Sequence, residues 1–164
     1  MIANIRPTKY SDLPTVLQIY STAREFMQCT GNLNQWVDGY PTQKLIEQDI
    51  ELGQSFVLIN DSDVIVGVFC FIIGEDPTYT KIYNGEWLNS EKYGTIHRIA
   101  SAGIVKGVGE AFIRWSFTQI NNVRVDTHRN NIVMQNLLTK LDFKYCGIIY
   151  LLNGAERLAY QKVI

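Results

Sequence analysis

The sequence contains little cysteine. Cys29, Cys70 and Cys146 are its three cysteines in 164 residues, and they are odd in number and widely spaced. Such a set fits neither a disulfide framework nor the paired spacing of a zinc site. Because disulfides are rare in reducing compartments, the pattern favours a cytoplasmic protein in which each cysteine acts as a small buried hydrophobe.

Long apolar runs and an excess of charge are also absent. No stretch of about 18 apolar residues occurs, so no membrane span is expected. The start, Met-Ile-Ala-Asn-Ile-Arg-Pro, lacks the basic-then-apolar order of a secretory signal. The formal net charge of -1 gives no basic field for nucleic acid. A length of 164 residues with 46% hydrophobic residues favours one domain spanning 1–164.

Hydrophobic periodicity predicts an α/β (α+β) architecture. Helical spacing is expected in four segments, at about 12–27, 42–52, 108–119 and 132–141. Strand-like runs occupy 2–6, 56–60, 64–73, 123–127, 143–152 and 157–163, and a further strand begins at Tyr93. Residues 74–92 are expected to form an insertion with little regular structure. Hairpins favour antiparallel pairs and helical links favour parallel ones, so we expect a mixed sheet with helices on both faces.

The stretch 93–109 reads Y-G-T-I-H-R-I-A-S-A-G-I-V-K-G-V-G. It predicts a buried strand, a glycine-bearing loop and the start of a helix. The free N–H groups and the dipole of a helix N-terminus attract anions, and glycines let a phosphate group approach the backbone. Lys106 would add a full positive charge, so we expect an anion site at Gly107 and Gly109.

Two common phosphate motifs are missing from this stretch. A Walker loop ends in Gly-Lys-Ser/Thr, and the chain has no such sequence. The dinucleotide fingerprint needs a third glycine where Phe112 stands. The loop must therefore hold a different phosphate ligand, or else only reverse the chain.

Residues 104–109, Ile-Val-Lys-Gly-Val-Gly, resemble the loop Gln/Arg-x-x-Gly-x-Gly/Ala of the GNAT superfamily of N-acetyltransferases, which holds the pyrophosphate of acetyl-coenzyme A. Ile104 departs from the usual Gln or Arg. A second stretch, 131–143, is similar to the family motif N-x-x-A-x-x-L-Y-x-K-x-G-F, and the matching residues are Asn131, Leu137, Lys140 and Phe143. The departures are Met134 for Ala, Leu138 for Tyr and Asp142 for Gly.

This resemblance implies a mixed, mostly antiparallel central sheet of about seven strands, with helices on both faces and strands 4 and 5 splayed apart. It also implies transfer of an acetyl group from acetyl-CoA to a primary amine of a small molecule or peptide, with no metal. The pantetheine arm of the co-substrate would lie between the splayed strands. The residues implied to bind it are Ile99, Ala100, Ser101, Ile104, Val105, Lys106, Gly107, Val108, Gly109, Asn131, Met134 and Leu138.

His97 is the candidate general base, because an imidazole can accept a proton near neutral pH. It lies four residues before Ser101, so the two are expected to share one face of the strand. The alternative is a hydrogen-bonded structural histidine. No Cys-His or Ser-His pairing is evident, which favours direct attack by the amine without a covalent enzyme intermediate.

The group that protonates the leaving thiolate is open, because Leu138 stands where the family has Tyr. Tyr145, Tyr150, Cys146 or water could substitute. Losing this acid typically costs about 10²–10⁴-fold in rate. A catalytically weak or inactive CoA-binding regulatory module is therefore a second hypothesis, and a site for another phosphorylated ligand, such as a nucleotide, is a third.

The acceptor pocket has no sequence signature of its own. Aromatic residues that could wall it are Trp36, Tyr40, Tyr79 and Trp87, and the alternative is ordinary packing under long loops. His128 and Asp126 lie two residues apart, but no third metal ligand at matching spacing accompanies them, so no metal site is expected. The identity of the acceptor and the oligomeric state, including a homodimer, stay open.

Overall fold

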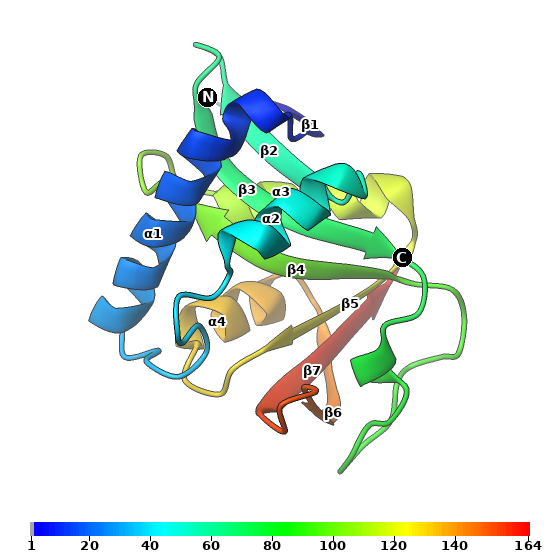
Figure 1. Ribbon diagram of the computed structural model, residues 1–164. Helices are drawn as coiled ribbons and strands as arrows, with labels where there is room; N and C mark the ends of the chain where they lie inside the picture. The colour runs from blue at the N-terminus through cyan, green and yellow to red at the C-terminus, as the bar shows by residue number, and fades with distance from the viewer. Residues whose placement is uncertain (1) are drawn as a thin grey trace.

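A single seven-stranded sheet forms the centre of the computed structural model, which describes residues 2–164 (Figure 1). The strands lie in the order β1-β2-β3-β4-β5-β7-β6. β4 and β5 run parallel, while the other neighbouring strands pair antiparallel. The predicted mixed, mostly antiparallel sheet of about seven strands is therefore confirmed.

The helices and strands have the following bounds. The strands are β1 (Ile2–Pro7), β2 (Ser55–Asn60), β3 (Ile65–Ile73), β4 (Gly94–Ser101), β5 (Asn122–Thr127), β6 (Lys144–Tyr150) and β7 (Glu156–Val163). The helices are α1 (Leu13–Cys29), α2 (Gln43–Glu51), α3 (Val108–Gln119) and α4 (Ile132–Lys140), with short 3-10 turns η1 (Tyr10–Asp12) and η2 (Pro77–Tyr79). Within residues 2–164, no helix is both long and apolar enough to cross a membrane.

Local sequence signals explain why the helices begin where they do. The Thr42 hydroxyl accepts a hydrogen bond from the Leu45 N–H at 3.3 Å and starts α2. The Asn131 side chain caps α4 by accepting from the Met134 N–H at 3.0 Å. Gly107 starts α3 in a left-handed conformation, with φ of 83°. These signals act over one helical turn, which is why the predicted bounds agree closely with the observed ones.

Two hydrophobic cores lie on opposite faces of the sheet. In Figure 1, α1 and α2 cover the front face and α3 and α4 lie behind it. The front core joins the two helices to the sheet through Val16, Ile19, Tyr20, Ala23, Ile46, Val57, Val68 and Ala100. The rear core is larger and is centred on Phe69 and Phe112, whose ring centroids are 4.1 Å apart. Helices on both faces were expected, and the sheet is buried from both sides.

A β-bulge interrupts β4 at Arg98. Val68 pairs with Ala100 and Cys70 pairs with His97, so Arg98 and Ile99 together stand opposite one residue of β3. Arg98 has φ of 53°, which is unusual for a residue other than glycine. Because the bulge adds one residue, side chains after it point to the opposite face of the sheet from the one that simple alternation predicts.

The expectation that His97 and Ser101 share a face is wrong for this reason. Ser101 lies directly across from Gly67, and a Cβ built on Gly67 would point at Val108 of α3, on the rear face. His97 lies across from Cys70, and the strand before the bulge alternates from Ile96, which belongs to the rear core. His97 is therefore on the front face and Ser101 on the rear face.

The insertion 74–92 has little regular structure, as predicted, but it is firmly packed. It contains η2 and one isolated bridge between Tyr83 and Ile148 of β6. Tyr79 is 1% exposed and belongs to a third cluster of buried side chains with Tyr93, Ile149 and Ala159. The insertion thus covers the front of the sheet near the paired ends of β4 and β5.

Candidate active site

The parallel pairing of β4 with β5 is short and ends inside the sheet. It consists of Gly94 with Val123, Thr95 with Arg124 and Ile96 with Val125. β4 continues to Ser101 and β5 to Thr127, but the two strands do not pair with each other beyond this point. Figure 1 shows them diverging past their paired ends. His97 and Asp126 are the first residues past the last pair, one on each side of the opening.

The N-terminus of α3 lies at the end of the loop that follows β4. The Ala111 N–H bonds to the Gly107 carbonyl, so the N–H groups of Val108, Gly109 and Glu110 lie ahead of the first helical hydrogen bond. Lys106 is exposed next to them. These amides, the helix dipole and a lysine make the loop suitable for an anionic group.

Glycines bring the elements around this loop close together. A Cβ on Gly109 would lie 2.9 Å from Cδ2 of Leu137 in α4, and one on Gly67 would lie 2.4 Å from Cγ1 of Val108. A Cβ on Gly107 would meet nothing within 4 Å. Glycine is therefore favoured at this position by its backbone conformation, with φ of 83°, and not by lack of space. The loop therefore uses its glycines for two different reasons.

The His97 imidazole is hydrogen-bonded to an acidic side chain from the insertion. Its Nε2 lies 2.9 Å from Oδ2 of Asp76, and the two side chains are 20% and 16% exposed. Burial alone would raise the pKa of Asp76, but the hydrogen bonds from His97 and Thr78 outweigh it and lower this pKa to about 2. Asp76 was not predicted, because nothing in the sequence of the insertion shows that it returns to β4.

Asp126 lies across the opening from His97 and has its own partners. Its Oδ2 accepts a hydrogen bond from the Tyr79 hydroxyl at 2.7 Å, and its Oδ1 lies 4.0 Å from Nε of the buried Arg157. Burial and the neighbouring Asp126 raise the pKa of Tyr79 well above its usual value. The hydroxyl therefore stays protonated and acts as a donor to Asp126.

The loop between α1 and α2 is fastened over this region through Gln35. Its Oε1 accepts hydrogen bonds from the side-chain amides of Asn131 and Asn32, both at 2.8 Å. Its backbone carbonyl accepts from Nη2 of Arg157 at 3.1 Å. The predicted cofactor residue Asn131 thus also ties α4 to this loop.

The four predicted aromatic wall residues form two separate groups. Trp36 and Tyr40 contact each other on the α1–α2 loop, with ring centroids 6.2 Å apart. Tyr79 and Trp87 pack together in the insertion at 5.1 Å, and Trp87 also lies over the Arg124 guanidinium at 4.1 Å. Because Tyr79 is 1% exposed, it supports Asp126 rather than forming an open surface. The structure therefore does not bring the four residues together as one wall.

The predicted cofactor residues are close in the fold but differ in accessibility. Ile99, Ala100 and Ser101 lie on β4, and residues 104–109 form the loop and the first turn of α3. Asn131 caps α4, and Met134 and Leu138 lie on that helix. Ile104 is 62% exposed, whereas Ala100 and Val108 are each 2% exposed and Leu138 is fully buried in the rear core. Leu138 offers no polar group to this region.

The three substitutes suggested for the missing tyrosine are wrong. Tyr145, Cys146 and Tyr150 all belong to β6, the edge strand, which β7 and β5 separate from β4. Burial also raises the pKa of the Cys146 thiol. Two tyrosine hydroxyls contact the bulge residue Arg98: that of Tyr20 donates to its carbonyl at 3.2 Å, and that of Tyr40 accepts from its guanidinium at 3.2 Å.

His128 and Asp126 each form hydrogen bonds with other groups of the protein. Among residues 2–164, no group of three or more His, Cys, Asp or Glu side chains is placed to hold a metal ion. Nδ1 of His128 instead accepts a hydrogen bond from the Asn130 N–H at 3.0 Å. Burial and the nearby Arg157 lower the pKa of His128, which favours this neutral, accepting form.

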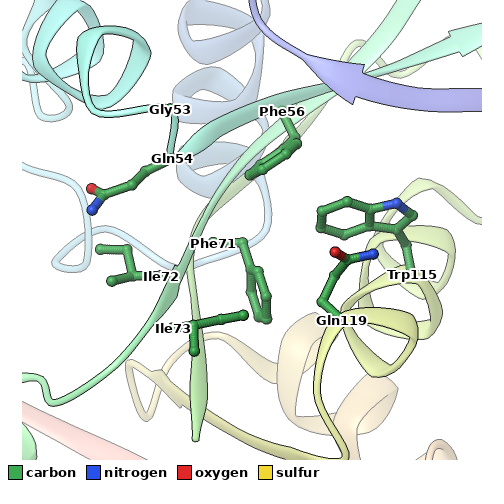
Figure 2. A pocket seen from close by; sticks show the side chains of 8 residues that line it. All are labelled: Gly53, Gln54, Phe56, Phe71, Ile72, Ile73, Trp115 and Gln119. Carbon is green, nitrogen blue, oxygen red and sulfur yellow. The ribbon is translucent and has the colours of Figure 1, made fainter.

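A shallow hollow elsewhere on the surface has a different character. Figure 2 shows the rings of Phe56, Phe71 and Trp115 around it, between the end of β3 and the second half of α3. Its volume is about 300 Å³. None of the residues that surround His97 or the α3 N-terminus lines it, so it is separate from the candidate active site.

Comparisons with known proteins agree with this geometry. No protein-family model and no curated protein matches the chain. Among solved structures, a GNAT-family acetyltransferase from Streptococcus agalactiae is similar over 98% of this chain and 95% of its own, with 33% identity and a TM-score of 0.88. One from Listeria monocytogenes covers 98% and 94%, with 19% identity and a TM-score of 0.72. A phosphinothricin acetyltransferase from Sinorhizobium meliloti, in complex with AcCoA, covers 100% and 89%, with 14% identity and a TM-score of 0.66.

A mixed sheet that opens between two parallel strands, beside a glycine-started helix, places the protein in the class of acetyltransferase folds. The Listeria and Sinorhizobium structures share the fold, and the Streptococcus structure is also similar in sequence over nearly its whole length. The chain belongs to the GNAT family of acetyltransferases.

Proposed function

We propose that this protein is an acetyl-CoA-dependent N-acetyltransferase that moves an acetyl group to the primary amine of a small molecule or peptide by direct attack. The observation that carries the proposal is the open edge of β4 beside the amide-lined N-terminus of α3. An edge that lacks a neighbouring strand needs hydrogen-bond partners. A ligand with both amide groups and a diphosphate supplies partners to both features.

Three features of the described residues fit such a ligand. The N–H groups of Gly107, Val108 and Gly109 would hold the pyrophosphate, and exposed Lys106 would add charge. The unpaired edge of β4 from Ile99 to Ser101 would bond the amides of the arm. In residues 2–164, the Thr127 hydroxyl at the end of β5 is fully buried and has no hydrogen-bond partner. A ligand amide in the opening could satisfy that hydroxyl.

Acetyl-CoA supplies a thioester carbonyl that an amine can attack, with loss of the thiolate. The chain must then orient the amine and remove a proton from it. His97 lies at the point where β4 and β5 separate, so we assign it the role of general base. The same face carries Asp126, Trp36 and Tyr40, which we assign to the acceptor side of the site.

The alternative is a CoA-binding regulatory module with little or no turnover. Leu138 favours it, because this fully buried leucine has no proton to donate to a thiolate. In the active enzyme, water would have to protonate the leaving group. The two functions therefore differ in turnover and not in binding.

Two measurements separate these functions. Acetyl-CoA is first titrated into the protein by calorimetry, with ATP as a control for a nucleotide site. Release of free thiol is then followed with phenethylamine, spermidine and a peptide with a free N-terminal amine. We expect binding of acetyl-CoA, no binding of ATP, and acetylation of at least one amine. Binding without thiol release above the uncatalysed rate would favour the regulatory module, and absence of binding would overturn both functions.

A further inference from the structure

The contact between His97 and Asp76 has a defined direction. Nε2 of the imidazole faces Oδ2 of the carboxylate at 2.9 Å. Within residues 2–164, no hydrogen bond to Nδ1 of His97 is formed. An ionised carboxylate can only accept, so Nε2 must carry the hydrogen in this contact. In the neutral ring, Nδ1 then holds the lone pair.

The Asp76 carboxylate is held in place by contacts other than the one with His97. Its Oδ1 accepts hydrogen bonds from the Thr78 N–H at 2.8 Å and from the Thr78 hydroxyl at 2.6 Å. The Asp76 N–H donates to the Tyr93 hydroxyl at 2.8 Å. These contacts leave Oδ2 for His97 alone. The pKa of about 2 keeps Asp76 ionised at neutral pH.

The other groups that face His97 do not compete with Asp76 for it. Arg98, the next residue of β4, forms an ion pair with Asp49 of α2, so the two charges offset each other. Cys70 lies across from His97 on β3, and burial raises the pKa of its thiol to about 12, so it is neutral at physiological pH. The ring of Tyr79 from η2 lies 6.3 Å away.

We propose that Asp76 is a positioning residue that fixes His97 as the Nε2–H tautomer and makes Nδ1 the atom that accepts the proton of the acceptor amine. This assignment rests on the proposed function. As the amine nitrogen bonds to the acetyl carbon, its N–H bond breaks and the proton moves to Nδ1. The ring becomes an imidazolium, and its positive charge is stabilised by Asp76. The electron pair of the broken carbon–sulfur bond leaves with the thiolate.

The tautomer can be measured without any turnover. The chain has two histidines, so a His128→Asn variant contains His97 alone, and Asn can still accept the Asn130 N–H. Nitrogen-15 NMR of labelled histidine distinguishes the two tautomers. We expect the Nε2–H form above neutral pH. Finding the Nδ1–H form would overturn the proposal.

Replacement of Asp76 by Asn tests the link to catalysis. The side-chain oxygen can keep the bonds from Thr78, while the new amide nitrogen lies in the position of Oδ2 and donates to Nε2. The ring should then switch to the Nδ1–H form and lose its free lone pair. In Ser–His–Asp enzymes the same change holds the wrong tautomer and costs about 10⁴-fold in kcat. We expect a loss of about 10²–10⁴-fold in kcat here, with an unchanged KM for acetyl-CoA.

Glu75→Gln is the matched control. It removes the same charge from the adjacent residue, which is exposed, and should leave both kcat and the tautomer unchanged. If Asp76→Asn is no slower than Glu75→Gln, or keeps the Nε2–H form, the proposal is wrong. Absence of thiol release by the unsubstituted protein with every amine tested would instead count against the proposed function, while the NMR result would still decide the tautomer.

Discussion

The Arg98 guanidinium donates two hydrogen bonds, of 2.9 and 2.8 Å, to the Asp49 carboxylate. A third hydrogen bond of 3.2 Å joins Arg98 to the Tyr40 hydroxyl. These contacts connect the bulge of β4 to α2 and to the loop before it. They also explain how a residue other than glycine holds a positive φ next to His97, because the surrounding contacts offset the backbone strain.

Breaking this pair should destabilise the protein strongly. Asp49 is 5% exposed, so Asp49→Ala leaves a buried arginine without its counter-charge. We expect the free energy of unfolding in urea to fall by about 3–5 kcal/mol. Gln48→Ala, at an exposed position of the same helix, should change it by no more than about 0.5 kcal/mol. Equal effects of the two substitutions would show that the pair contributes nothing specific.

Removal of the proposed base should affect turnover and not binding. We expect His97→Ala to lower kcat by about 10²–10⁴-fold. The affinity for acetyl-CoA, measured by calorimetry, should stay the same, because the imidazole lies on the front face and the loop amides lie beyond the bulge. An unchanged kcat across the pH range would remove His97 from the mechanism.

The two left-handed glycines Gly107 and Gly53 allow a controlled test of the phosphate loop. Their φ values are 83° and 67°, and a Cβ on either would meet nothing within 4 Å. Alanine should therefore cost about 1–2 kcal/mol of stability at each position, through backbone strain alone. Since Gly107 precedes the free amides of α3 and Gly53 follows α2, we expect Gly107→Ala alone to weaken acetyl-CoA binding, by about tenfold. Equal affinities in the two variants would place the diphosphate elsewhere.

Most of the fold could be predicted from the sequence because its signals are local. Caps such as Thr42 and Asn131 act within one turn, and the alternation of strands is read residue by residue. The splayed strands followed from the resemblance of two motifs to those of a known family.

The candidate site was only partly predictable, because its contacts join distant segments. Asp76 reaches His97 across 21 positions, and Arg98 reaches Asp49 across 49. The bulge that separates the faces of His97 and Ser101 has no glycine to mark it. Tyr145 was a reasonable acid until the pairing of β6 with β7 placed it at the far edge of the sheet.

Acid should weaken the folded state through Asp76, and the sign follows from its pKa. The folded-state pKa is lowered from 3.8 to about 2. At pH values above the unfolded-state pKa, the ionised carboxylate therefore contributes about 2 kcal/mol of stability. This contribution is lost as the pH falls through the folded-state pKa of about 2. We expect the difference in unfolding free energy between the unsubstituted protein and Asp76→Asn to be largest near pH 6 and about half as large near pH 3. Glu75→Gln should show little difference at either pH, because Glu75 is exposed. A difference for Asp76→Asn that does not change between these pH values would mean that the carboxylate is not stabilised by His97 and Thr78 in the way the structure indicates.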